Sequence, residues 1–251
     1  MSFKKAALLA CALFAAGASL TNAQARDVLR VGTEPTFAPF EFLDTKTKEF
    51  AGFDIDLIRA VADKAGYDVQ ILNMGFDALL PALMTDTIDV VASGMSITPE
   101  RAERVDFTKP YYKTGLSMLV RKSDAEKYTQ FSHLEGRPIA VQIGTTGADK
   151  AKSIKDAKVT AFNTTSDAFM ALSTGSADAV ILDRPVIGYF LKSQPRLAKK
   201  LQLQPTMEDA ASFGFAVKKG NTALLEKLNK AYDELEASGD AKKIFDKWFA
   251  E

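Results

Sequence analysis

Short β-rich runs alternate with helix-like segments along most of this chain, and that alternation constrains its fold more than any other feature. Runs of β-branched and apolar residues predict strands at residues 29–32, 69–72, 90–92, 105–107, 116–120, 139–142, 159–162 and 179–182. Amphipathic patterns predict helices from residue 54 and over residues 77–84, 166–173 and 185–192. This arrangement predicts α/β layers with mainly parallel sheets.

The first 25 residues predict a secretory signal peptide. Two lysines precede an apolar run over residues 6–16, and Ala23-Gln24-Ala25 forms an A-x-A cleavage site. The run is too short to span a membrane, which takes about 20 apolar residues. Cys11 faintly suggests a lipoprotein box, but apolar residues continue past it, so we favour a soluble periplasmic product. The chain from Arg26 onward then contains no cysteine and no disulfide.

Charge and residue usage argue against several functional classes. The 32 basic and 32 acidic residues balance, so we expect no surface for nucleic acid or an anionic membrane. His133 is the only histidine, which excludes a histidine metal cluster, and its place in a polar loop argues against a Ser-His-Asp triad. We expect His133 to be an exposed loop residue. The sequence therefore favours a binding protein over an enzyme, without a cofactor or a metal.

Arg101 is the first candidate ligand contact. It follows a strand end in Ser93-Gly94-Met95-Ser96-Ile97-Thr98-Pro99-Glu100-Arg101, where Thr98 is a suitable N-cap and Pro99 a suitable first helical residue. A cation in the first turn opposes the helix dipole, so Arg101 is expected to meet an anion. Its planar fork suits a carboxylate, although a solvated surface arginine is the alternative.

Two further candidates follow predicted strands in the second half of the chain. The turn Gly144-Thr145-Thr146-Gly147 exposes backbone N–H groups that can bind an anion, or can simply cap a helix. Asp183 follows the strand at residues 179–182, and ligands bind at such strand ends in open α/β sheets. Asp183 can equally be the N-cap of the helix that begins near Pro185, and the sequence does not decide between these interpretations.

The stretch Gly52-Phe53-Asp54-Ile55-Asp56-Leu57 opens an amphipathic helix that Gly66 is expected to end. Asp54 and Asp56 place negative charge in its first turn, where the helix dipole favours it. In residue order, and with the motifs downstream, the chain resembles the family 3 extracellular solute-binding proteins. These are ligand-binding components of bacterial polar amino-acid ABC transporters. The resemblance covers essentially the whole chain after the signal peptide.

This resemblance implies an α/β, two-lobed, periplasmic-binding-protein-like type II fold with a hinge of two strands. Its segments would be the signal peptide at 1–25, lobe one at 26–110 and 214–251, lobe two at 116–208, and hinge crossings at 111–115 and 209–213. A hinge of this kind closes through a few φ/ψ changes at the ends of elements.

The resemblance also implies how the ligand's main-chain groups are held. Arg101 with Thr146 would bind the α-carboxylate. Asp183 would pair with the α-ammonium, helped by the carbonyl of Gly94 and the hydroxyl of Ser96.

The ligand side chain would lie between the rings of Phe37 and Phe76, with Glu34 and Gln142 at its far end. Some glutamine binders carry lysine at the position of Gln142, and no lysine is evident here to neutralise Glu34. A buried carboxylate needs a partner, and the rings attract cations, so arginine, lysine or histidine is favoured and glutamine comes next.

These features predict a monomeric periplasmic protein that captures a free polar L-amino acid and delivers it to an ABC permease in the inner membrane. The main alternative is an extracytoplasmic cyclohexadienyl dehydratase, acting on prephenate or arogenate, on the same fold. Asp183 argues against prephenate, which has no ammonium group, but not against arogenate. A sensor module of a membrane kinase is less favoured, because no membrane segment or catalytic domain is evident up to Glu251.

Overall fold

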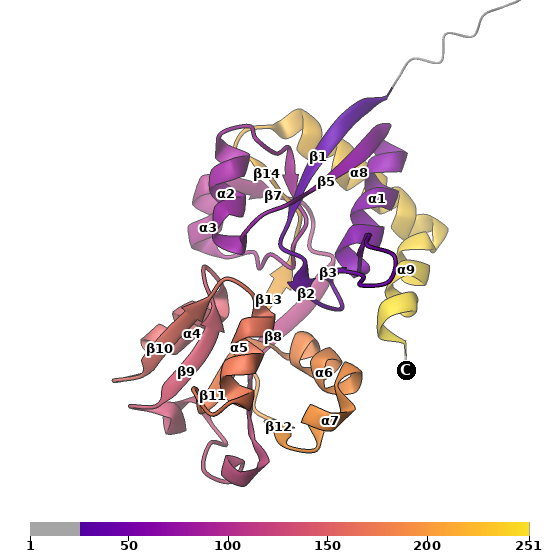
Figure 1. The fold of residues 1–251 in the computed structure, drawn as a ribbon. Coiled ribbons are helices and arrows are strands. Elements are labelled where there is room, and N and C mark those ends of the chain that lie inside the picture. Colours follow the sequence, from indigo (N-terminus) through magenta and orange to yellow (C-terminus); the bar gives the residue numbers. More distant parts are fainter. Residues whose placement is uncertain (1–25, 251) are drawn as a thin grey trace, which may run out of the picture.

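The computed structural model describes residues 26–250, so the predicted signal peptide and Cys11 lie outside the described residues. Two α/β lobes are joined by strands β8 and β13 (Figure 1). We call the unit built on the first sheet lobe one and the unit built on the second sheet lobe two. These two main sheets each contain both parallel and antiparallel strand pairs.

Lobe one contains the first sheet, a small sheet and five helices. The strand order of the first sheet is β5 (Tyr67–Asn73), β1 (Asp27–Thr33), β6 (Val90–Val91), β14 (Ala216–Lys218) and β7 (Val105–Phe107). The small sheet has β2 (Thr36–Phe37), β3 (Glu41–Leu43) and β4 (Phe50–Ala51). The helices are α1 (Phe53–Ala65), α2 (Phe76–Met84), α3 (Pro99–Arg104), α8 (Thr222–Ser238) and α9 (Asp240–Phe249).

Lobe two is built on the second sheet. Its strand order is β10 (Lys158–Phe162), β9 (Pro138–Gln142), β11 (Ala179–Asp183), β8 (Tyr112–Arg121) and β12 (Leu201–Leu203), and β13 (Glu208–Phe213) also pairs with β8. The α-helices are α4 (Thr146–Ser153), α5 (Thr165–Ser173), α6 (Arg184–Ser193) and α7 (Pro195–Ala198). Two short 3-10 helices, η1 (Lys122–Asp124) and η2 (Phe131–Leu134), precede β9.

The expectation of mainly parallel sheets was wrong for the strands at and after the crossings. β8 runs antiparallel to β11, β12 and β13, and β14 runs antiparallel to β6 and β7. The chain leaves lobe one before β8 and returns through β13, so β14 enters the first sheet from the opposite direction. Strand direction here depends on this long-range path and not on the local alternation of elements.

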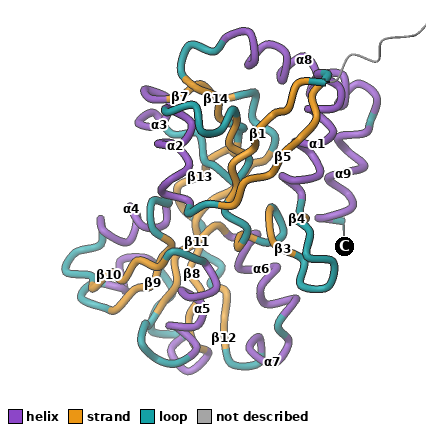
Figure 2. The backbone as a smooth tube through the Cα atoms, turned by 45° about the horizontal axis from the view of Figure 1, so that its top comes forward, coloured by secondary structure: helices purple, strands orange, loops and turns teal. Residues whose placement is uncertain are grey.

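Helix α1 forms for the local reasons that its sequence suggests. Ile55, Leu57 and Ile58 are fully buried on the face that packs into lobe one, and burying such a side chain is worth about 1.5–3 kcal/mol. Gly66 ends the helix with φ +86, a left-handed conformation in which glycine has no steric penalty. Helices α8 and α9 lie against α1 in both views (Figures 1 and 2).

The two connecting strands form an antiparallel pair. Phe213 pairs with Tyr112 and Ala211 with Thr114, and the N–H of Tyr111 donates to the carbonyl of Phe213 at 3.0 Å. A register irregularity separates Glu208 from Ala211. We propose that the hinge crossings lie at residues 111–115 and 209–213 of this pair.

Candidate ligand-binding site

Arg101 extends from α3 across the boundary between the lobes. The hydroxyl oxygen of Thr98 accepts from the N–H of Arg101 at 3.2 Å and starts the helix as predicted. The guanidinium donates to the carbonyl of Ser96 at 2.9 Å and to that of Gly144, in lobe two, at 3.0 Å. Its Cζ atom lies 5.5 Å from the centre of the Phe76 ring, within range of a cation–π contact.

The structure does not support the helix-dipole argument for Arg101. Helix α3 is only six residues long, so Arg101 belongs to its last turn as well as its first. Burial lowers the pKa of Arg101, and the nearby carboxylates of Asp149 and Asp183 oppose this effect. The half-buried side chain therefore stands out by its reach across the lobes, not by its place in the helix.

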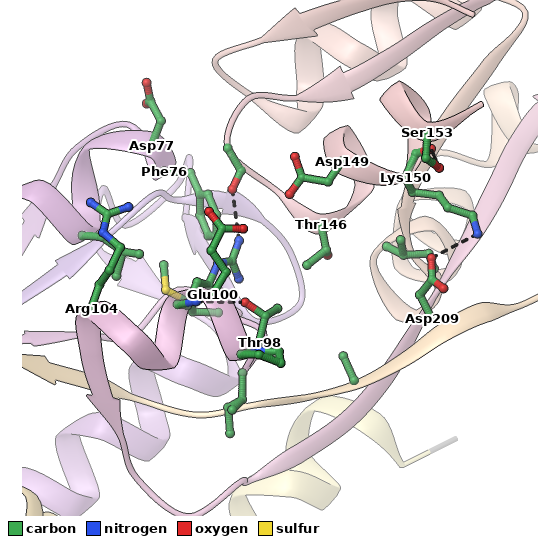
Figure 3. Close-up of a pocket in the computed structure, with 18 of the residues that line it drawn as sticks. Phe76, Asp77, Thr98, Glu100, Arg104, Thr146, Asp149, Lys150, Ser153 and Asp209 are labelled. Carbon is green, nitrogen blue, oxygen red and sulfur yellow. Dashed lines mark hydrogen bonds and ion pairs between the residues drawn. The ribbon is translucent and has the colours of Figure 1, made fainter. Parts of the chain in front are cut away.

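The predicted anion-binding turn lies where β9 leads into α4. Thr145 is the N-cap: its hydroxyl accepts from the N–H of Ala148 at 3.2 Å and donates to the carbonyl of Gln142 at 2.7 Å. Thr146 lines the cleft between the lobes (Figure 3). Gly144 has φ +75, and a Cβ there would lie 3.2 Å from the Cα of Asp77, so the lobes approach closely at this turn.

Asp183 lies at the end of β11 and is only 5% exposed. Asp183 occupies the N-cap position of α6, as one of the two interpretations predicted, but its side chain makes no capping hydrogen bond there. One carboxylate oxygen accepts from the hydroxyl of Thr114 at 2.9 Å. Burial raises the pKa of Asp183 to about 6, while the Thr114 hydrogen bond and the charge of Arg101 act in the opposite direction. Asp183 is thus a buried acid whose carboxylate does not cap the helix.

Glu34 and Gln142 meet directly across the two lobes, and they are 4% and 1% exposed. The amide nitrogen of Gln142 donates to Oε2 of Glu34 at 2.7 Å and to the carbonyl of Asn163 at 3.2 Å. Thr36 also donates its hydroxyl to Oε2 of Glu34, at 2.7 Å. Burial raises the pKa of Glu34, and these hydrogen bonds oppose the rise.

One buried oxygen atom at this end of the site has no hydrogen-bond partner among the described residues. Oε1 of Gln142 is buried and accepts no hydrogen bond within residues 26–250. Both partners of its Nε2 are acceptors, which fixes the orientation of the amide group. The far end of the proposed site therefore offers a free oxygen and no free amide donor from Gln142.

Phe37, Phe76, Gly94 and Ser96 complete the predicted set, and both rings are buried. Gly94 has φ +47, and a Cβ there would lie 2.7 Å from the Phe37 ring. Only glycine combines this backbone conformation with such close approach. Ser96 is buried and forms a β-bridge with Phe213 at the hinge.

A cavity of about 920 Å³ lies between α2 and α3 of lobe one and α4 of lobe two (Figure 3). Phe76, Arg101 and Thr146 line it. The other six predicted residues are absent from its lining, namely Glu34, Phe37, Gly94, Ser96, Gln142 and Asp183. These six lie deeper, and all of them are buried.

The two lobes also contact each other directly near these residues. Besides the Glu34–Gln142 and Arg101–Gly144 bonds, the N–H of Thr165 donates to the hydroxyl of Thr36 at 3.2 Å. The hydroxyl of Thr165 also donates to the carbonyl of Thr36. The two lobes are therefore in direct contact around the predicted site, and we propose that a ligand reaches the deeper residues when the lobes separate.

Several polar residues beside this site were not predicted as part of it. The hydroxyl of Ser93 accepts from the N–H of Glu34 and donates to Glu41, each at 3.0 Å. Glu41 is buried, and burial followed by the charge of Asp54 raises its pKa well above the usual range. An acid between two phenylalanines, as in Phe40-Glu41-Phe42, is the signal that could have identified it.

Two structural properties bear on other classes of function. Within residues 26–250, no cluster of three or more histidine, cysteine, aspartate or glutamate side chains is placed to hold a metal ion. No helix in that range has the length and apolar character needed to cross a bilayer. His133 is exposed, as predicted.

Comparisons with known proteins cover both lobes. A sequence model of the bacterial extracellular solute-binding proteins, family 3, matches residues 29–251. The ABC transporter arginine-binding protein 1 of Escherichia coli (strain K12) is 35% identical over 249 residues, covering 97% of each chain.

Solved structures of similar proteins share the fold. One is an ancestral arginine-binding protein bound to arginine, at TM-score 0.85 and 40% identity, covering 90% of this chain and 99% of that one. An ancestral arginine-binding protein bound to glutamine has TM-score 0.82 and 40% identity, covering 90% and 100%. The ancestral amino acid-binding protein AncCDT-1, a precursor of cyclohexadienyl dehydratase, has TM-score 0.81 and 37% identity, covering 88% and 95%.

Proposed function

The chain belongs to the bacterial extracellular solute-binding proteins of family 3, and from that premise we propose that it captures a basic L-amino acid in the periplasm. Proteins of this group are the amino-acid-binding components of ABC transporters. Arginine, lysine or histidine is the favoured ligand and glutamine the second choice. The loaded protein would deliver its ligand to an inner-membrane permease.

The observation that carries this proposal is a pair of opposite charges, one from each lobe. Arg101 extends from α3 of lobe one, and Asp183 is buried at the end of β11 in lobe two. The two groups are close enough for the charge of each to shift the pKa of the other. An amino-acid zwitterion complements such a pair, because its carboxylate can meet Arg101 and its ammonium can meet Asp183.

The far end of the site supports a cationic side chain. The amide nitrogen of Gln142 donates to Glu34 and Asn163, so Oε1 is the atom of this amide that has no hydrogen-bond partner within residues 26–250. A guanidinium, ammonium or imidazolium group offers donors to that oxygen and to Glu34. The amide of a glutamine ligand would also bring a carbonyl oxygen, which Gln142 cannot satisfy without breaking its bonds to Glu34 and Asn163.

Closure of the lobes is the proposed mechanism of capture. The ligand would contact lobe one in an open form and then bridge to lobe two. Such bridging shifts the population toward the closed form, because the ligand binds that form more tightly than the open form. Because the ligand contacts are divided between Arg101 of lobe one and Asp183 of lobe two, only the closed form makes all of them. A permease would recognise this closed form.

A cyclohexadienyl dehydratase remains the second candidate, because AncCDT-1, itself an amino acid-binding protein, is a precursor of that enzyme. Arg101 would serve a substrate carboxylate equally well in that enzyme. Asp183 distinguishes the two functions for prephenate, because prephenate has no ammonium group to meet a buried acid.

A thermal-shift screen over the common L-amino acids tests the proposal first. A ligand at a hundred times its Kd stabilises the folded state by about 2.7 kcal/mol, so a true ligand should raise the Tm clearly. We expect the largest shift from a basic amino acid. If none of the amino acids shifts the Tm, the proposed function is wrong.

Glu34→Gln then tests the preference for a basic side chain. Losing the charge of Glu34 should weaken arginine binding about tenfold or more and weaken glutamine binding far less. Calorimetry with both ligands on wild type and variant measures the difference, with Glu49→Gln, an exposed glutamate of lobe one, as the control. Tight glutamine binding with no response to any basic amino acid contradicts the preference but leaves the family assignment intact.

A further inference from the structure

The two acids in the first turn of α1 have different surroundings. Asp56 accepts from Nζ of Lys247 at 2.7 Å and from the indole N–H of Trp248 at 2.8 Å, so it fastens α9 to α1 (Figure 1). Asp54 is fully buried on the other side of the turn. A favourable place in the helix dipole explains both acids equally, so it cannot explain why Asp54 is buried.

Asp54 connects the proposed site to the start of β8. Its Oδ2 accepts from the N–H of Gly94 at 2.8 Å and from the hydroxyl of Tyr111 at 2.6 Å. Gly94 belongs to the turn after β6 that carries the proposed ammonium contacts. Tyr111 immediately precedes β8, in the proposed hinge crossing. One carboxylate oxygen thus bonds a binding turn and a hinge segment at once.

The Gly94 turn needs such support. Gly94 has φ +47 and lies against the Phe37 ring, so its backbone must hold an unusual conformation in a crowded place. On the preceding residue, the hydroxyl of Ser93 is fixed by Glu34 and Glu41. The N–H of Gly94 is held by Asp54, so side-chain bonds fix this turn at both Ser93 and Gly94.

The stability of the fold does not explain why an acid, Asp54, is buried at this position. Burial raises the pKa of Asp54 to about 6 despite the bonds from Tyr111 and Gly94, and its Oδ1 accepts no hydrogen bond within residues 26–250. A buried acid with an unpaired oxygen destabilises a fold, and such acids are often retained for a function.

We propose that Asp54 is a positioning residue for ligand capture: through the Gly94 N–H it orients the turn that meets the ligand's α-ammonium, and through Tyr111 it ties that turn to the hinge. This inference rests on the proposed function, because it assumes that the ligand is an amino acid. It assigns Asp54 no direct ligand contact. Its effect should therefore depend on the α-amino group of the ligand.

The test compares two ligands on four proteins by calorimetry. The ligands are L-arginine and 5-guanidinopentanoic acid, which is arginine without its α-amino group. The proteins are wild type, Asp54→Ala, Asp54→Asn and the control Asp56→Asn, an acid of the same turn that faces α9. The melting temperature of each unliganded protein is measured alongside, so that affinities are compared only where the protein is folded.

Asp54→Ala should weaken arginine binding about 10- to 100-fold and weaken the deaminated analogue by no more than about threefold. Asp54→Asn keeps an acceptor for the Gly94 N–H, so it should recover arginine affinity to within about tenfold of wild type, with the analogue again less affected. Asp56→Asn should lower the melting temperature and leave both affinities unchanged.

Equal losses for the two ligands, or lower melting temperatures with unchanged affinities, would reduce Asp54 to a structural residue. If Asp54→Ala does not fold, Asp54→Asn decides by the same comparison of ligands. If wild type prefers another amino acid, that amino acid and its deaminated analogue replace the pair. A wild type that binds no amino acid overturns the proposed function, whereas binding with an unselective Asp54 effect overturns this inference alone.

Discussion

The two lobes supply the proposed site in different ways. In lobe one the binding groups are held by neighbours in the same lobe, since Ser93 bonds Glu34 and Asp54 bonds Gly94. In lobe two, Gln142 and Asp183 project from the ends of neighbouring strands. The amide of Gln142 finds one of its two acceptors across the cleft, on Glu34.

We propose that this difference gives the lobes different tasks. Lobe one would present a pre-formed surface that a ligand can meet while the lobes are apart. In lobe two, Gln142 and Asp183 also bond Asn163 and Thr114 of their own lobe, and among these contacts only the bond from Gln142 to Glu34 depends on closure. Lobe one substitutions should therefore affect initial binding, and lobe two substitutions should affect the gain from closing.

Arg101→Ala should have the largest effect, because it removes the half-buried charged group with which lobe one reaches across to lobe two. Truncating one member of such a pair costs about 2–5 kcal/mol, or about 30-fold to several-thousand-fold in affinity. Calorimetry on folded variants measures the loss. The control is Arg104→Ala, an exposed arginine of the same helix that also lines the cavity. A folded Arg101→Ala protein that binds within a few-fold of wild type contradicts the assignment.

Asp183→Asn should weaken amino-acid binding about 10- to 150-fold, because the α-ammonium keeps a neutral acceptor but loses its counter-charge. Calorimetry with Asp156→Asn, an exposed acid of lobe two away from the cavity, provides the control. The same purified proteins should be incubated with prephenate. Formation of phenylpyruvate, with little effect of Asp183→Asn on substrate affinity, decides for the dehydratase.

The pH dependence should have opposite signs for binding and for stability. Asp183 has a pKa of about 6, so its ionised form, which attracts the ammonium, is lost as the pH falls through 6. Affinity should be about tenfold lower at pH 5 than at pH 7. This pKa lies above the value of about 3.9 in an unfolded chain, so the contribution of Asp183 to the stability of the unliganded fold is lost as the pH rises through 6.

Titrations at pH 5, 6 and 7 measure the first effect, and thermal unfolding at the same pH values measures the second. The Asp183→Asn variant isolates the contribution of this residue to each. An affinity that is the same at pH 5 and pH 7 would contradict the role of Asp183.

Thr165→Val should have the smallest effect, because it disturbs only closure. Its hydroxyl bonds the carbonyl of Thr36 across the lobes, and losing one hydrogen bond costs about 1 kcal/mol, or about fivefold in affinity. The control is Thr160→Val on an exposed position of β10. Small-angle scattering of the unliganded variant should show a more open average form. An effect as large as that of Arg101→Ala would mean that closure, not lobe one, dominates binding.

Local structure could be predicted from the sequence to a useful extent. The strand at residues 105–107 has the predicted bounds, Thr98 caps α3 as predicted, and Gly66 ends α1 as predicted. These features depend on side-chain periodicity and on hydrogen bonds between residues a few positions apart, which a sequence displays directly. The resemblance to solute-binding proteins added the family, which the comparisons confirm.

Other features were decided by tertiary structure alone. The sequence places Asp54 and Asp56 in the same helical turn, yet one reaches Gly94 and the other reaches Trp248. It left Asp183 undecided between a helix cap and a buried acid, and it gave no direction for the amide of Gln142. The reason is distance along the chain: Gln142 meets Glu34 from 108 positions away, and Asp56 meets Trp248 from 192. Contacts of that kind arise only when separate segments pack together, so local pattern determined the elements of this protein and packing determined the groups that face its cleft.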